Sequence, residues 1–468
     1  MSLEDFKHRP MEFHPEPRHD GFPHPSPVFS TLVEMLRHRA AEQPQRLSHS
    51  FLLDGETEET SLTYAQLEQR AMAIAVLLQE MGAAGQRVLL LYPPGLEYIA
   101  AFFGCLCAGV VAVPAYPPRM NRSLSRLQAI AHDAQPVAAL TTAALLGKAE
   151  KLFAVAPELS RFRWLSTDDI ELDNAQEWQE PRLAGDTLAF LQYTSGSTST
   201  PKGVMVSHGN LLHNEQTIQR VFRQSEQSLI VGWLPLYHDM GLIGNVLQPV
   251  FLGASCILMS PAAFLQRPLR WLQAISRYRA TTSGGPNFAY ELCVNKVRPE
   301  ELDALDLSSW SVAFNGAEPV RAETLARFAD AFAPCGFRRE AFYPCYGLAE
   351  ATLLVSGKLK TGAASVERVV AKELERDRIV QADGEGAEAR ALVGCGGSLS
   401  DQSVLIVNPE TSLKCAPGVV GEVWVSGPSV AQGYWNRPDE TKRTFEGRLA
   451  DTGEGPFLRT GDLGFLHD

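Results

Sequence analysis

The stretch Tyr193–Gly203, "YTSGSTSTPKG", places six serine and threonine residues, two glycines and one lysine in eleven positions. Glycine lets the backbone fold closely around an anion, hydroxyls donate hydrogen bonds, and a lysine adds positive charge. In a Walker A loop the lysine follows the last glycine and a helix comes next, whereas here Lys202 precedes Gly203 and the next residues, "VMV", are typical of a strand. A plain surface loop could share this composition, but the pattern favours a loop that binds phosphate.

A second candidate is "YGLAEAT" at Tyr346–Thr352, which follows the predicted strand "EAFYP". We expect a helix to begin here, with an aromatic ring, the close-approach glycine Gly347 and the carboxylate of Glu350 at its N-terminus. A carboxylate is a ligand that Mg²⁺ accepts beside nucleotide phosphates. The alternative is that Glu350 only complements the charge of the helix end.

The segment "LPLYHDMG" contains the neighbours His238 and Asp239. An adjacent His and Asp suggest a catalytic dyad, but neighbours in sequence seldom point together, and no G-x-S-x-G motif supplies a serine. We therefore interpret His238 as a residue that positions a substrate.

The elements that would hold these residues follow an alternating pattern. From about Phe29 to Ala189, amphipathic helices alternate with short apolar strands, and a second set runs from about Thr187 to Gly357. "TYAQLEQRAMAIAVLLQEMG" predicts a helix capped by Thr63 and ended by Gly82. Such alternation predicts an α/β fold with mostly parallel sheets.

The sequence divides into four regions. After about residue 392 the strands are short, with Gly and Pro between them, which predicts a small β-rich, barrel-like subdomain. The predicted regions are an N-terminal arm at 1–28, a first α/β subdomain at 29–189, a second at 190–392 with a polar insertion at 357–391, and the β-rich subdomain at 393–468.

Composition excludes several classes of protein. A net charge of −12 argues against nucleic-acid binding. Eight scattered cysteines without a C-x-x-C pair indicate buried thiols in a reducing compartment, and we expect a cytoplasmic protein. The uncharged stretch Ile99–Tyr116 is broken by Gly109 and Pro114, so it predicts a buried helix and strand and no transmembrane segment. The four histidines of the N-terminal arm could chelate a metal, but a loose arm is the simpler interpretation.

Together these stretches resemble the adenylate-forming superfamily, which includes acyl-CoA synthetases and peptide-synthetase adenylation domains. "YTSGSTSTPKGV" is similar to its phosphate-binding signature. It is followed in the family's order by "LPLYHDMG", "NGAEPV" at Asn315–Val320, "YGLAEAT", "GEVWVSGPSVAQGYW" at Gly421–Trp435 and "RTGDLG" at Arg459–Gly464. The resemblance covers the chain from about Phe29 onward.

The resemblance implies a reaction in which a carboxylate attacks the α-phosphorus of ATP, with Mg²⁺, giving an acyl-adenylate and pyrophosphate. It implies catalytic roles for Lys202, His238 and Glu350, with Glu350 also binding Mg²⁺. It implies that Tyr346 and the Gly316-Ala317 pair enclose adenine and that Asp462 binds both ribose hydroxyls, although "TGDLG" alone would be a common β-turn. The remaining residues implied to bind ATP or AMP are Thr194, Ser195, Gly196, Ser197, Thr198, Gly347 and Ala351.

The acid being activated is predicted from apolar residues. "LPLYHDMGLIG" is similar to the fatty-acid-activating pattern and lacks the early aspartate of amino-acid-activating members. Met240, Ile243, Gly284 and Phe288 are expected to line an alkyl tunnel, although ordinary core packing would explain each of them.

The stretch "LYPPGLEYIAAFFGCLCAGVVAVPAYPPR" and the insertion at 357–391 resemble fatty acyl-AMP ligases, which hand acyl-adenylates to acyl carrier proteins. An acyl-CoA synthetase, an amino-acid-activating domain and a non-catalytic nucleotide- or acyl-binding module are the alternatives. The sequence stops where the family enters a hinge and a mobile C-terminal domain that carries a second lysine. We therefore expect a large N-terminal portion that binds ATP but adenylates slowly.

Overall fold

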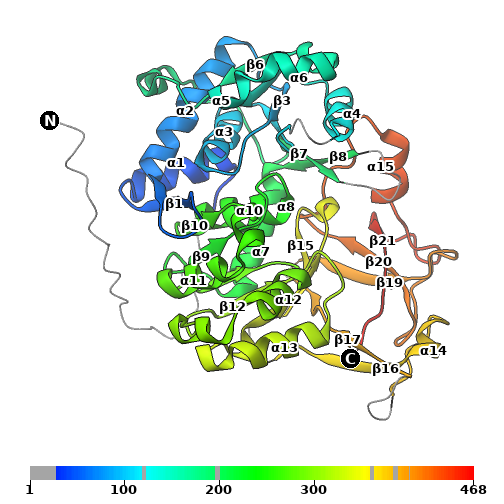
Figure 1. Ribbon diagram of the computed structural model, residues 1–468. Coiled ribbons are helices and arrows are strands. Elements are labelled where there is room, and N and C mark those ends of the chain that lie inside the picture. The colour runs from blue at the N-terminus through cyan, green and yellow to red at the C-terminus, as the bar shows by residue number, and fades with distance from the viewer. Residues whose placement is uncertain are drawn as a thin grey trace.

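The computed structural model describes residues 28–118, 123–194, 201–358, 363–382, 388–399 and 401–467. Residues 1–27 of the predicted N-terminal arm, which include its histidines, and residues 195–200 of the predicted phosphate loop therefore lie outside the described residues. Two large sheets stand one above the other in Figure 1, and the β-rich C-terminal part lies to one side of both. The predicted α/β fold with a small β-rich part is confirmed.

The upper sheet has six strands within the described residues, in the order β6-β5-β3-β4-β7-β8. All its pairs are parallel except β7 with β8. Its strands are β3 Arg87–Leu90, β4 Val111–Pro114, β5 Ala138–Thr141, β6 Arg163–Ser166, β7 Leu188–Thr194 and β8 Lys202–Ser207.

The lower sheet has seven strands in the described part of the chain, in the order β13-β12-β11-β9-β10-β1-β2, and only β2 is antiparallel to its neighbour. Its strands are β1 Leu47–Leu52, β2 Glu59–Thr63, β9 Leu229–Gly232, β10 Ser255–Met259, β11 Thr282–Gly284, β12 Val312–Asn315 and β13 Phe342–Pro344.

The two sheets do not follow the order of the chain. Strands β1 and β2, from the predicted first subdomain, join the lower sheet, whereas β7 and β8, from the predicted second one, complete the upper sheet. Residue 189 therefore lies within β7 and does not separate the sheets. Long-range pairing of β1 with β10 and of β7 with β4 produces this exchange.

Helix α3, Leu96–Cys107, lies between the two sheets and contacts β1 of one and both β3 and β4 of the other. Every residue of α3 except Glu97 is buried, which explains the uncharged stretch found in the sequence. Its neighbour α2, Tyr64–Glu80, begins at the predicted cap, where the Thr63 side chain accepts from the Gln66 amide. None of the helices in the described ranges has the length and apolar character that a bilayer span requires.

The other α-helices are mostly short. They are α1 Leu32–Glu42, α4 Ser125–Ala134, α5 Ala143–Leu146, α6 Ala149–Val155, α7 His208–Phe222, α8 Asp239–Leu242, α9 Gln248–Leu252, α10 Pro261–Gln266, α11 Leu269–Tyr278, α12 Asn287–Lys296, α13 Ala322–Phe332, α14 Ala371–Leu374 and α15 Pro438–Phe445. A π-helical turn spans Ile243–Leu247, and 3₁₀ turns span Pro157–Ser160, Leu172–Glu177, Pro299–Ala304, Ala333–Cys335, Arg339–Ala341 and Ala349–Ala351.

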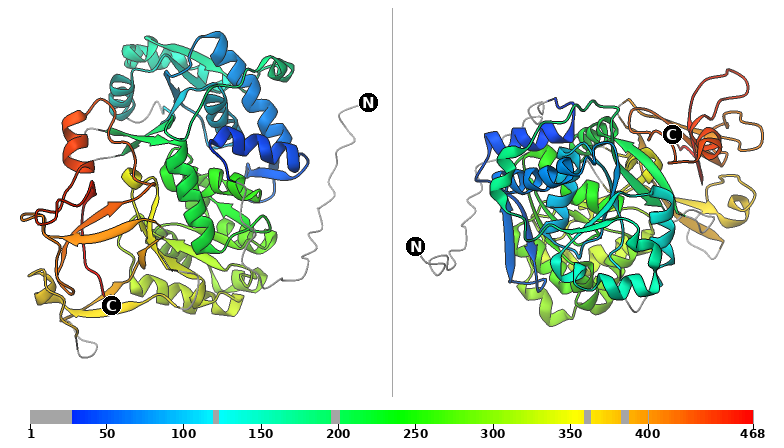
Figure 2. Two further views of the ribbon diagram at one scale, coloured as in Figure 1. Left: turned by 180° about the vertical axis from the view of Figure 1, so that it is seen from behind. Right: turned by 90° about the horizontal axis from the view of Figure 1, so that it is seen from above.

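Small antiparallel sheets make up the C-terminal part, drawn in yellow to red in Figure 2. Their strands are β14 Tyr346–Gly347 with β15 Leu354–Gly357 and β18 Gly397–Ser398, β16 Val366–Val370 with β17 Ala389–Val393, and β19 Ser403–Val407 with β20 Gly421–Ser426 and β21 Leu458–Gly464. Strand β16 and the first residues of β17 lie within the predicted insertion.

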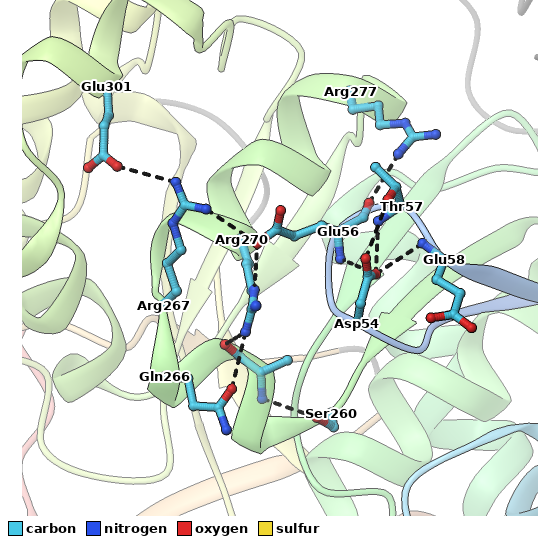
Figure 3. Close-up of polar contacts among 11 residues, drawn as sticks. Asp54, Glu56, Thr57, Glu58, Ser260, Gln266, Arg267, Arg270, Arg277 and Glu301 are labelled. Carbon is cyan, nitrogen blue, oxygen red and sulfur yellow. Dashed lines mark hydrogen bonds and ion pairs between the residues drawn. The ribbon is translucent and has the colours of Figure 1, made fainter.

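A network of charged residues fixes the turn between β1 and β2 against α11 (Figure 3). Asp54 Oδ1 accepts hydrogen bonds of 2.8–3.0 Å from the amides of residues 56–58. Glu56 Oε1 accepts from Arg270 Nε at 2.9 Å, and its carbonyl accepts from Arg277 Nη1 at 3.0 Å. The edge hairpin of the lower sheet is thereby held in register.

Candidate active site

The predicted motifs gather at one edge of the lower sheet. Because β9, β11, β12 and β13 are parallel, their carboxyl ends meet at that edge, which is where open α/β sheets bind ligands. Each of these strands is followed by a predicted motif, namely Leu234–Gly241 after β9, Gly284–Phe288 around the end of β11, Gly316-Ala317 after β12 and Tyr346–Thr352 after β13.

The predicted phosphate loop connects β7 to β8. Thr194 pairs with Lys202 where the hairpin opens, so the lysine stands at the base of the loop. The predicted site residues Ser195, Gly196, Ser197 and Thr198 lie outside the described residues. The strand expected after Lys202 is confirmed as β8.

Lys202 contacts the C-terminal segment "GYWNRPDET". Its Nζ forms an ion pair with Glu440 Oε2 on α15 and lies 5.1 Å from the centre of the Tyr434 ring. The backbone of this segment is fixed on β8, because the Trp435 amide donates to the Gly203 carbonyl at 2.8 Å. The lysine therefore has carboxylate and aromatic partners from a distant part of the chain.

Glu350 is connected to Lys202 through Tyr434. The Tyr434 hydroxyl donates to Glu350 Oε1 at 2.7 Å. Burial raises the pKa of Glu350, and the hydrogen bond from Tyr434 and the charge of Lys202 oppose that rise. Burial also raises the pKa of Tyr434 well above its ordinary value, so the phenol stays a proton donor.

The helix predicted at "YGLAEAT" is absent from these described residues, so that prediction is wrong. Tyr346-Gly347 form the short strand β14, residues 349–351 make a single 3₁₀ turn, and Thr352 follows with φ +69°. The chain turns back because β14 pairs antiparallel with β15. Glu350 therefore sits in a tight turn rather than at the end of an α-helix, and Ala351 beside it is fully buried.

Tyr346 and Asp462 lie together although 115 residues separate them in the chain. The Tyr346 hydroxyl donates to Asp462 Oδ2 at 2.7 Å, and Asp462 is exposed on β21. A Cβ at Gly347 would overlap the carbonyl oxygen of Leu353, so only glycine fits beside the ring. The hydrogen bond thus joins the Tyr346 ring to a carboxylate on β21.

The Gly316-Ala317 pair follows β12 closely. A Cβ at Gly316 would lie 3.1 Å from both the carbonyl oxygen and Sγ of Cys345, and Ala317 has φ +69°. Position 316 therefore lies directly against the residue that precedes Tyr346. Helix α13 then begins at Ala322.

His238 and Asp239 do contact each other, contrary to the expectation for neighbours in sequence. His238 caps α8, and its Nδ1 forms an ion pair with Asp239 Oδ1. The Asp239 carboxylate holds the pKa of His238 above its usual range. The cap turns both side chains to one side, because the Met240 amide donates to Asp239 Oδ1 at 2.6 Å and approaches His238 Nδ1 at 3.4 Å.

The predicted acyl-binding residues fall into two groups. Gly284, at the end of β11, allows the Phe314 carbonyl to approach the backbone closely. Phe288 on α12 is 45% exposed and packs edge-on against Trp233, with 5.9 Å between the ring centres. Met240 is partly buried against the core, and Ile243 is fully buried in the π-helical turn. Only Phe288 therefore presents a large surface that a ligand could touch directly in this conformation.

Sequence reasoning missed Tyr434 and Glu440 as members of this site. The quoted motif "GPSVAQGYW" included Tyr434, but a tyrosine in a glycine-rich loop carries no sign of its partner. Glu440 stands in the charged helix "PDETKRTF", which reads as an ordinary exposed helix. Both residues are found only through the pairing of this segment with β8.

A second polar cluster resembles a hydrolytic triad but cannot act as one. His213 Nδ1 lies 2.6 Å from Ser429 Oγ, and its Nε2 lies 2.7 Å from Asp401 Oδ1. Ser429 is fully buried and also accepts from Asn214 at 3.0 Å, so no substrate can reach its hydroxyl. The cluster instead joins α7 to the loop that leads into "GYW".

Comparison with known proteins agrees with this architecture. A family described as AMP-binding enzyme matches residues 36–435. The medium-chain-fatty-acid acyl-carrier-protein ligase JamA of Moorena producens is 51% identical over 94% of this chain and 76% of its own length. The long-chain-fatty-acid–AMP ligase FadD26 of Mycobacterium tuberculosis H37Rv is 38% identical, with coverages of 94% and 77%.

A solved structure gives the same result. The fatty acyl-adenylate ligase of L. pneumophila, in complex with acyl adenylate and pyrophosphate, superposes with a TM-score of 0.87 at 46% identity, covering 94% of this chain and 75% of that one. The chain therefore spans about three quarters of the length of these relatives. On this evidence it belongs to the AMP-binding enzyme family, beside the fatty acyl-AMP ligases.

Proposed function

We propose that the chain activates a fatty acid with ATP, forming an acyl-adenylate and releasing pyrophosphate, and that the acyl group passes to an acyl carrier protein. The observation that carries the proposal is the convergence of Lys202, Glu350 and the Tyr346–Asp462 pair, from four separate elements, beside the carboxyl edge of the lower sheet. Relatives named as acyl-carrier-protein and AMP ligases support the choice of acid and acceptor.

In the proposed reaction a carboxylate oxygen of the acid forms a bond to the α-phosphorus, and the bond from that phosphorus to the bridging oxygen of pyrophosphate breaks. No protein nucleophile takes part, so catalysis rests on positioning and charge neutralisation. Lys202 would bind phosphate oxygens, and His238, held by Asp239, would orient the acid. Adenine would lie between Tyr346 and Gly316-Ala317, with the ribose at Asp462.

The residues present fit Mg²⁺. The described part of the chain contains no cluster of three or more His, Cys, Asp or Glu that could hold a metal by itself. Mg²⁺ is commonly held by one or two carboxylates together with substrate phosphates and water, and the half-buried Glu350 supplies one carboxylate. When bound, the ion would neutralise charge on the phosphate oxygens, while Tyr434 keeps the Glu350 carboxylate oriented.

Two further parts of the proposal concern substrate and location. Phe288 and Trp233 would stand at the wall of an alkyl-binding region, and the names of the relatives cover both medium and long chains. We also place the protein in the cytoplasm, because all eight cysteines are free thiols. An acyl-CoA synthetase is the second candidate.

The test is ATP–pyrophosphate exchange with fatty acids of increasing chain length and with amino acids, followed by addition of CoA or a holo carrier protein. It is run on the 468-residue chain and on any longer natural form, which also tests the expectation that the 468-residue chain adenylates slowly. Exchange driven by fatty acids, with transfer to the carrier and none to CoA, is expected, and Lys202→Ala should abolish it. Efficient acyl-CoA formation would favour the synthetase. Absence of exchange with any acid would refute the activity.

A further inference from the structure

The ion pair between Lys202 and Glu440 joins the base of the predicted phosphate loop to helix α15. Both side chains are largely buried, with 21% of Lys202 and 24% of Glu440 exposed. Lys202, together with the neighbouring Arg437, holds the pKa of the Glu440 carboxyl below its usual range, so this group is ionised at neutral pH. The lysine that would bind phosphate in the proposed reaction is therefore already paired with a carboxylate.

Glu440 is held in this place by contacts on both sides. Arg437 Nη1 lies 3.8 Å from Glu440 Oε1, while Arg437 Nη2 binds Asp133 Oδ1 at 3.2 Å. Asp133 Oδ2 in turn accepts from the Tyr193 hydroxyl at 2.7 Å, and Tyr193 lies on β7. Glu440 therefore belongs to a network that links α15, α4 and the β7–β8 hairpin, and differs from an isolated surface ion pair.

We infer that Glu440 is a positioning residue that competes with phosphate for the Lys202 ammonium, and so weakens the binding of pyrophosphate and of the terminal phosphates of ATP. The inference rests on the proposed function. An ammonium has three protons, but a second anion brought to it must approach the Glu440 carboxylate as well, and like charges at short range repel. The consequence is faster release of pyrophosphate after adenylation.

A carboxylate in this place has one alternative role. Glu440 could hold the lysine side chain extended toward the phosphates, in which case removing its charge would weaken phosphate binding. The Tyr434 ring argues for competition, because it lies 5.1 Å from Lys202 Nζ and the ring, fixed by its own bond to Glu350, already restrains the lysine without Glu440.

The test compares Glu440→Gln with Asp439→Asn. Asp439 is the exposed neighbour on α15, so this variant removes the same charge one residue away. Dissociation constants for pyrophosphate, ATP and AMP, each with Mg²⁺, are measured by calorimetry, which does not require turnover. We expect Glu440→Gln to bind pyrophosphate about fivefold more tightly, the order expected for a close, partly screened charge pair. AMP binding and Asp439→Asn should each change less than about twofold.

The outcomes separate the two hypotheses. Unchanged or weaker pyrophosphate binding by Glu440→Gln, with the wild type binding normally, would overturn the competition. An equal gain in pyrophosphate affinity in Asp439→Asn would mean that any lost negative charge on α15 has this effect, and would also overturn the competition by Glu440. Failure of the wild type to bind ATP or pyrophosphate would instead refute the proposed function. Glu440→Asp, which keeps the charge on a shorter side chain, should lie between wild type and Glu440→Gln, and thermal unfolding of each variant verifies its fold.

Discussion

The hydrogen bond from Tyr434 to Glu350 allows a direct test of the proposed Mg²⁺ ligand. Replacing Tyr434 by Phe removes the donor that lies 2.7 Å from Glu350 Oε1 and leaves the ring beside Lys202. Burial already raises the pKa of Glu350, and this hydrogen bond opposes the rise. A hydrogen bond to a charged group contributes about 1.5–3 kcal/mol, and one pKa unit corresponds to about 1.4 kcal/mol. We therefore expect Tyr434→Phe to raise the pKa of Glu350 further, because the hydrogen bond that stabilises its ionised form is lost.

The assay is the pH dependence of ATP–pyrophosphate exchange at saturating substrate. Only the ionised carboxylate binds a cation, so the acidic limb of the measured profile should move to higher pH by about one to two pH units. Well above that limb, the rate should approach that of the wild type. Tyr278→Phe is the matched control, because the Tyr278 hydroxyl also donates to a carboxylate, Glu59 Oε2, at 2.7 Å, but at the exposed edge of the lower sheet.

Two results would refute this reasoning. An acidic limb in Tyr434→Phe that coincides with the wild-type limb would mean that Glu350 does not control it, and an equal shift in Tyr278→Phe would show a nonspecific effect. Stability supplies an independent check. The pKa of Glu350 is higher in the folded chain than in the unfolded chain, so the folded chain holds this proton more tightly. The free energy of unfolding therefore decreases as pH rises from the pKa of the unfolded carboxyl to that of the folded one. Tyr434→Phe should extend this decrease to higher pH.

Three further predictions concern packing, surface charge and the acyl wall. Gly241→Ala would place a Cβ on the carbonyl oxygen of Pro235, and we expect a loss of at least about 2 kcal/mol in the free energy of unfolding, measured by denaturant titration, together with loss of exchange. Asp401→Asn should lower the free energy of unfolding by less than about 1 kcal/mol, because Asp401 is 64% exposed. Pairing with His213 lowers the pKa of Asp401, so this loss of stability should be present at neutral pH and disappear in acid. Urea unfolding midpoints measured across pH would show it. Phe288→Ala should change the ratio of exchange rates for long and short fatty acids without changing the KM for ATP, and unaltered chain-length ratios would remove Phe288 from the acyl site.

Features set by a few neighbouring residues could be predicted from the sequence. The cap at Thr63, the helix and strand within Ile99–Tyr116, and the strand after Lys202 each depend on local periodicity or on a single turn residue, and all three are confirmed. The exchange of strands between the two sheets could not be predicted, because the pairing of β1 with β10 depends on packing between distant parts of the chain.

In the candidate site, too, local features could be predicted from the sequence and long-range contacts could not. Its motifs could be recognised and placed at strand ends, but the predicted helix at Glu350 is one 3₁₀ turn, since the antiparallel pairing of β14 with β15 outweighs local helix preference. The partners of Lys202 could not be found, because Tyr434 and Glu440 reach it only through the pairing of their segment with β8. No pattern of spacing contains that information.

The carboxylates around Lys202 have different expected roles in phosphate binding. The surroundings of this lysine include the cations Arg437 and Arg443 and the carboxyl groups of Glu350, Glu440 and Asp133. Carboxylates therefore stand beside the cations at this site, in a protein that already carries a net charge of −12. Phosphate binding would then draw on the cation proposed at Glu350 as well as on Lys202. In the proposed arrangement the Glu350 carboxylate binds a divalent ion. Glu440, in contrast, weakens the binding of pyrophosphate to Lys202 once the acyl-adenylate has formed.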